Sequence, residues 1–177
     1  MFHLEQAIRQ FNAMYKMPVN DVPTLTPTNE PMSERLIKFK SILKKELNEI
    51  DAIILEARAT EDIGKQDDGT KVLLLTDLAD LLGDIQVFCA SEMLKFGLPL
   101  DKTLHLIMMS NFSKLNPDGS ATFDEEGKLQ KGPNYWKPEP YIQKMLQDHI
   151  ADHARTQSMP AVGPVASPAK DNLVEPQ

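Results

Sequence analysis

The sequence predicts an all-α protein built as a helical bundle, and three observations predict it. None of the 13 prolines lies between residues 32 and 98, and because proline breaks helix interiors, long helices fit in that interval. Apolar residues recur three and four positions apart, as on one face of a helix, both within this interval and in the segments before and after it. No alternating pattern is long enough to form a central sheet.

The N-terminal half is expected to hold three helices. Residues 3–16 carry apolar side chains at helical spacing, and the proline-rich residues 17–32 predict an extended connector. A helix is expected over residues 33–62 with Ser33 as its N-cap, and another over residues 70–96. Gly64 and Gly69 mark the turn between them, and Gly97 followed by Pro99 predicts the end of the second helix.

The C-terminal half is expected to hold two further helices and a small hairpin or ordered loop. Asp101 suits the N-cap of a helix that reaches residue 114, and turn residues punctuate residues 116–133. A last helix is predicted over residues 139–154. Residues 155–177 are rich in Pro, Ala, Ser and Val without periodicity, which predicts a disordered tail after a single domain of residues 1–154.

Composition excludes several classes of protein. The chain has 19 basic and 26 acidic residues, a net charge of −7, which argues against binding a nucleic acid polymer. No apolar run is long enough for a membrane span, and no secretory signal is recognisable, so we expect no membrane partner. The single cysteine excludes an intrachain disulfide, and a cytoplasmic location is the expectation.

Carboxylates interrupt the apolar seams of the two long helices. On the first, Glu46 and Glu49 lie between apolar residues at three- and four-residue steps, and on the second Asp77, Asp80 and Asp84 do the same. Unpaired carboxylates on a packing face are costly unless a cation accompanies them. Because Asp and Glu are hard oxygen ligands, the two patches predict a site for Mg²⁺, with Mn²⁺ as an alternative. A solvated acidic face is the competing interpretation.

These motifs resemble a known family. Glu46-Leu47-Asn48-Glu49 followed by Asp77-Leu78-Ala79-Asp80 resembles the ExxE…ExxD pattern of the all-α nucleoside triphosphate pyrophosphohydrolases, which include MazG-like proteins, dimeric dUTPases and phosphoribosyl-ATP pyrophosphohydrolases. The segments 110–119 and 131–136 look like the phosphoribosyl-ATP-pyrophosphohydrolase-like branch common in phages and bacteria. The resemblance covers roughly residues 3–142. It departs from the usual pattern at Asp77, where Glu is common.

The resemblance implies hydrolysis of a nucleoside triphosphate between its α and β phosphates, with a deoxypurine nucleotide such as dGTP as the favoured substrate. It implies four metal ligands, Glu46, Glu49, Asp77 and Asp80, with Glu49 as the preferred base for the attacking water. Asp84, one helical turn further along, is either an additional ligand or a group that supports the ligands. The resemblance implies substrate contacts from Asn111, Lys114 and Lys131, while Tyr135 and Trp136 either stack on the base of the substrate or pack the C-terminal segment. It also implies a bundle completed by homo-oligomerisation, as a homodimer or homotetramer, since two long helices enclose too little core alone.

Two alternatives remain open at this stage. One is a non-catalytic helical interaction module, in which the acids set pairing specificity and magnesium has no role. The other is an enzyme of the same fold that acts on a different pyrophosphate-linked metabolite.

Overall fold

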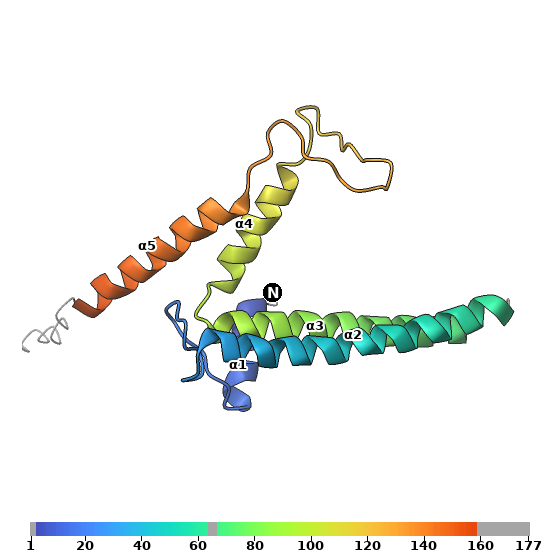
Figure 1. The fold of residues 1–177 in the computed structure, drawn as a ribbon, viewed down its shortest axis with the longest axis horizontal. Coiled ribbons are helices and arrows are strands. Elements are labelled where there is room, and N and C mark those ends of the chain that lie inside the picture. Colours follow the sequence, from blue (N-terminus) through green and yellow to red (C-terminus); the bar gives the residue numbers. More distant parts are fainter. Residues whose placement is uncertain (1–2, 64–66, 159–177) are drawn as a thin grey trace, which may run out of the picture.

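The structure, a computed structural model, describes residues 3–63 and 67–158. Within these residues the chain forms five α-helices and no named strand, so the predicted all-α class is confirmed. Figure 1 shows two parts: a long hairpin of α2 and α3, and an arm of α4 and α5 that rises from one end of it. No described helix is long and apolar enough to cross a membrane.

The hairpin pairs α2 (Met32–Ile63) with α3 (Asp68–Lys95) side by side along their lengths. Asp67 caps α3, because its side chain accepts a hydrogen bond from the Thr70 amide at 2.9 Å. The helix ends before Gly97, which adopts the left-handed conformation with φ of 68°. A Cβ at this position would collide with the backbone of Val22, so the connector packs directly onto the end of α3.

The core lies at this end of the hairpin, where α1 (Leu4–Met14) and the start of α4 (Leu100–Phe112) meet α3. Ile8, Ala90, Leu94 and Leu100 form its buried apolar cluster. The fully buried Asn12 on α1 accepts a hydrogen bond from the Ser91 hydroxyl at 2.6 Å, which ties α1 to α3. The other end of the hairpin has no third helix against it in the described chain.

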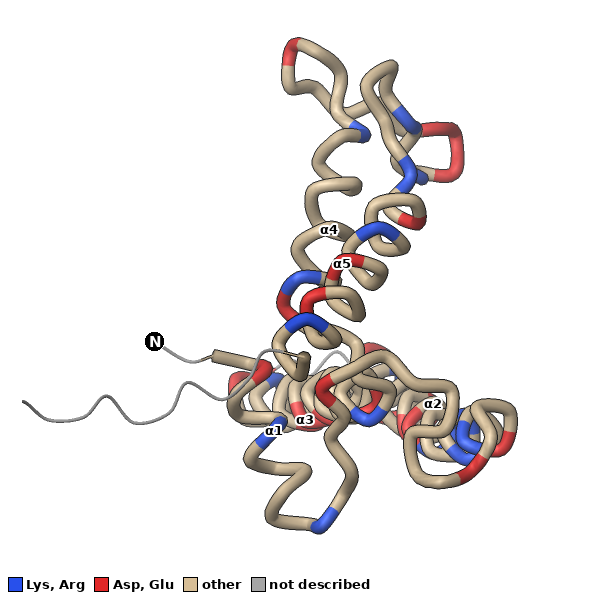
Figure 2. Tube along the Cα trace, turned by 90° about the vertical axis from the view of Figure 1, so that its left-hand side faces the viewer, with Lys and Arg blue, Asp and Glu red and all other residues tan. Residues whose placement is uncertain are grey.

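The arm pairs α4 with α5 (Pro138–Ser158), and a long loop joins them at the far end (Figure 1). In this loop one isolated antiparallel bridge links Phe123 and Leu129, and the Thr122 carbonyl accepts a hydrogen bond from the Gln130 amide at 2.7 Å. The segment is therefore a loop with one bridge, and the described residues do not form the strands of a hairpin. Figure 2 shows acidic and basic residues interspersed along the arm.

Several predicted boundaries are wrong by a few residues. Ser33 and Asp101 lie inside the first turns of α2 and α4, and Pro99 occupies the N-cap of α4. Gly69 belongs to α3 rather than to the turn, and residues 64–66 lie outside the described residues. The last helix continues to Ser158, so residues 155–158 are helical, while the rest of the predicted tail, residues 159–177, lies outside the described residues.

Candidate functional site

The predicted metal ligands lie in the middle of the hairpin, and Glu46 is at their centre. Although Glu46 carries a carboxylate, it is only 8% exposed on α2. Its pKa is raised, first by burial and then by the negative charges of Glu49, Asp84 and Asp80, while Lys45 acts in the opposite direction. Carboxylates from both helices therefore act on one side chain across the hairpin.

The other acids are more open to solvent. Glu49, Asp80 and Asp84 are exposed, and so is Asp77, which is not among the charges that raise the pKa of Glu46. Across residues 3–63 and 67–158, no three His, Cys, Asp or Glu side chains stand close enough together to hold a metal ion. The structure thus brings three acids within electrostatic reach of Glu46, without a formed coordination shell in the described residues.

At Gly83, between Asp80 and Asp84, no atom of the described chain other than its own chain neighbours and the nearby backbone of α3 lies within 4 Å of the position that a Cβ would occupy. No side chain or distant backbone segment of the described residues therefore packs against this glycine.

The residues predicted to bind substrate gather elsewhere, at the far end of the arm. Lys114 donates a hydrogen bond to the Asn111 amide oxygen at 2.8 Å, and the Lys131 ammonium lies 4.7 Å from the centre of the Tyr135 ring. The Trp136 carbonyl accepts a hydrogen bond from Ser110, and its ring packs on Tyr141. The 13 residues of α4 span about 20 Å, so within one chain this group and the acids are far apart.

A buried ion triad, which sequence reasoning missed, lies where the hairpin meets the core. Glu92 on α3 is 5% exposed, and its two carboxylate oxygens accept hydrogen bonds from the Arg35 guanidinium of α2, both at 2.6 Å. Lys95 donates to the same carboxylate at 3.2 Å. The hydrogen bond to Glu92 raises the pKa of Arg35, whereas burial lowers the pKa of Lys95. The signal available in the sequence was a Glu and a Lys three residues apart within an apolar stretch.

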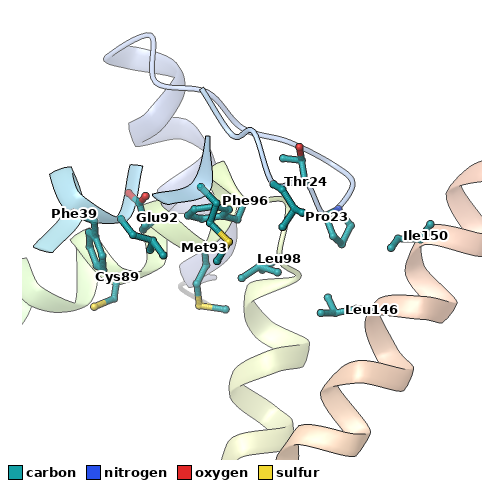
Figure 3. A pocket seen from close by; sticks show the side chains of 13 residues that line it. Pro23, Thr24, Phe39, Cys89, Glu92, Met93, Phe96, Leu98, Leu146 and Ile150 are labelled. Atoms are coloured by element: carbon teal, nitrogen blue, oxygen red, sulfur yellow. The ribbon is translucent and has the colours of Figure 1, made fainter. Parts of the chain in front are cut away.

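Two cavities flank this triad, and Phe39 and Glu92 line both of them. The larger one, about 610 Å³, is almost wholly apolar and opens between the end of the hairpin and α5. Figure 3 shows Leu146 and Ile150 of α5 across this cavity from Phe96. The smaller cavity, about 330 Å³, lies between α1 and the hairpin.

Comparisons with known proteins add little. No family model matches the chain, and no curated protein matches it. A solved structure from Exiguobacterium sp. 255-15, described as a candidate NTP pyrophosphohydrolase, is similar with a TM-score of 0.42 and 19% sequence identity, over 89% of this chain and 99% of that chain. A similarity this remote assigns neither a family nor an activity.

Proposed function

We propose that the protein is a Mg²⁺-dependent nucleoside triphosphate pyrophosphohydrolase, which hydrolyses its substrate between the α and β phosphates to give a monophosphate and pyrophosphate. The observation that carries the proposal is the cluster of acids around Glu46 in the middle of the hairpin. There a nearly buried carboxylate has its pKa raised by burial and by acids of both helices. Such like-charge crowding costs stability unless a cation offsets it, and this cost supports the proposal of a cation bound beside Glu46.

The donor set fits magnesium or manganese. Glu46, Glu49, Asp77, Asp80 and Asp84 offer only carboxylate oxygens, the ligands that these hard ions prefer. Four of the five are exposed, so their side chains are free to turn toward an ion beside Glu46. When bound, the ion would neutralise phosphate oxygens and so admit a triphosphate to an acidic protein.

Glu49 is the proposed general base. It is exposed and follows Glu46 by one helical turn, so its carboxylate can accept a proton from a water molecule beside the α phosphate. The buried Glu46 is better suited to hold the ion in place, because packing restricts its side chain.

We also propose that the protein works as a homodimer or homotetramer. Leu55 and Leu73, near the end of the hairpin that lacks a third helix, are 67% and 68% exposed, and a second chain would cover them. In one chain Asn111, Lys114 and Lys131 do not reach the acids. Their proposed role in holding the triphosphate, and that of Tyr135 and Trp136, depends on the arm of a second chain.

The test is a nucleotide panel. Purified protein is incubated with each NTP and dNTP plus Mg²⁺, and released pyrophosphate is measured; we expect release, with dGTP among the best substrates, and none in excess EDTA. Glu46→Gln keeps the shape of the side chain and should lower the rate at least ~100-fold, with unchanged circular dichroism. The exposed Glu56→Gln on the same helix is the matched control. No pyrophosphate from any nucleotide would refute the proposal, and a wild-type rate in Glu46→Gln would refute the metal assignment.

One observation favours a second candidate, a non-catalytic interaction module: the exposed apolar side chains of the hairpin suit a partner helix as well as a second copy. This candidate predicts partner binding without magnesium and no turnover of any nucleotide. A same-fold enzyme acting on another pyrophosphate-linked metabolite would instead keep its magnesium dependence and fail only in the nucleotide panel.

A further inference from the structure

The smaller cavity has the composition of a site for a flat, polar-edged ring. Aromatic residues make up much of its lining, together with a few charged and hydroxyl-bearing residues. Six of the residues that line it are Phe11, Tyr15, Phe39, Phe88, Ser91 and Lys95. Pockets that bind small molecules combine such apolar walls with a few polar groups that select the ligand.

The cavity adjoins the acidic part of the hairpin. Ile42 lines it from α2, one helical turn before Glu46, and Phe88 lines it from α3, one turn after Asp84. One turn is about 5.4 Å along the helix axis. A ligand whose ring lies among the aromatic side chains could therefore place the group attached to that ring near the acids.

The polar groups that line the cavity are largely hydrogen-bonded to one another, with one exception. Both Glu92 oxygens are engaged by Arg35, and the Ser91 hydroxyl donates to Asn12. The Lys95 side chain is 8% exposed and forms an ion pair with Glu92 at 3.2 Å. Because an ammonium group has three donors and no acceptor, Lys95 retains capacity for a ligand that presents acceptors.

We propose that this cavity binds the base of the nucleotide substrate, with the aromatic side chains packing on the ring and Lys95 donating a hydrogen bond to a keto oxygen or ring nitrogen. The proposal rests on the proposed function for the identity of the ligand. A volume of about 330 Å³ is near the lower end of ligand pockets, ~300–1,000 Å³, so it suits a base while the triphosphate lies outside it over the acids.

The hydrogen-bonding chemistry of Lys95 also predicts which nucleobase the cavity prefers. Guanine presents two acceptors side by side, O6 and N7, whereas adenine presents a donor amine in place of O6. A buried ammonium that can only donate therefore favours guanine over adenine. Tyr15 lines the cavity, is 65% exposed and is tilted against Phe11 at 4.9 Å between ring centres, so its ring is available to pack on a nucleobase.

The experiment measures binding of dGMP and dAMP to the full chain in EDTA, by isothermal titration calorimetry, so that neither the metal ion nor turnover contributes. We expect dGMP to bind more tightly than dAMP. Lys95→Met should weaken dGMP binding roughly tenfold or more and remove the preference. Tyr15→Ala should weaken both nucleotides by at least about fivefold, through lost stacking. Lys71→Met, an exposed lysine on the same helix, is the matched control and should bind like wild type.

The outcomes separate this proposal from the proposed function. Since Tyr15 is exposed, Tyr15→Ala tests the cavity even if Lys95→Met does not fold. Unchanged dGMP binding in the folded variants would overturn the base site, even if wild-type protein releases pyrophosphate from dGTP. Conversely, weakened dGMP binding in the variants would support the base site, even if no nucleotide were hydrolysed.

Discussion

Neutralising Glu92 should destabilise the protein more than any change to its exposed acids. The Glu92→Gln variant keeps the side-chain volume, but it leaves the Arg35 and Lys95 side chains, 12% and 8% exposed, without their counter-charge. Removing one partner of a buried ion pair typically costs about 3–5 kcal/mol, because the remaining charge stays desolvated. Solvent screening is weak here since all three groups are nearly buried, so we expect a loss in that range.

A loss of this size is measurable by thermal and urea denaturation, followed by far-ultraviolet circular dichroism at one fixed protein concentration. Each kcal/mol lowers the melting temperature by about 2–4 °C for a chain of this length, so Glu92→Gln should lower it by roughly 6–20 °C. Glu56→Gln, which removes an exposed acid from α2, should change the free energy of unfolding by less than about 0.5 kcal/mol.

A compensating variant distinguishes lost charge from lost shape. Replacing the whole triad by apolar residues, Arg35→Met with Glu92→Leu and Lys95→Met, should recover most of the stability, since no unpaired charge remains. If the free energy of unfolding of Glu92→Gln is within about 0.5 kcal/mol of the wild-type value, the triad does not exist as a buried network in solution, and the reasoning fails.

Two further predictions concern the backbone and the assembly. Gly97→Ala should lower the free energy of unfolding by at least about 1–3 kcal/mol, because its φ of 68° is strained for alanine and the new Cβ would collide with Val22; Gly119→Ala, also at positive φ but with open space around it, is the control for strain alone in urea denaturation. Leu55→Lys with Leu73→Lys should reduce the mass measured by light scattering at micromolar concentration to that of the monomer. A monomeric wild-type protein in the same measurement would contradict the proposed assembly.

The helices were predictable because their signals are local. The absence of proline between residues 32 and 98 and the helical spacing of apolar residues depend only on neighbours along the chain, and α2 and α3 form where those signals predict them. Helix ends were less predictable. Ser33 and Asp101 are good capping residues, yet each helix begins earlier, because the Pro31 and Pro99 carbonyls accept the first helical hydrogen bonds, from the Arg35 and Thr103 amides.

The candidate site, too, was predictable in its local features but not in those that depend on tertiary packing. The spacing of Glu46 and Glu49, and of Asp80 and Asp84, placed each pair on one helix face, and the structure brings the other three acids within electrostatic reach of Glu46. Spacing along one helix could not say that Glu46 is buried while Glu49 is exposed. It also could not say that Lys114 and Lys131 lie at the far end of an arm, since that depends on the direction in which α4 leaves α3.

The sequence by itself determined the helical class, the two long helices and the faces on which their acids lie, because periodicity and proline act over a few residues. Only the tertiary structure decided which polar residues are buried. Arg35 and Glu92 are 57 positions apart and look like ordinary surface charges in the sequence. Their pairing beside Lys95, and the aromatic cavity next to it, arise because α1, α2 and α3 pack together at one end of the hairpin, and packing between distant segments has no local signal.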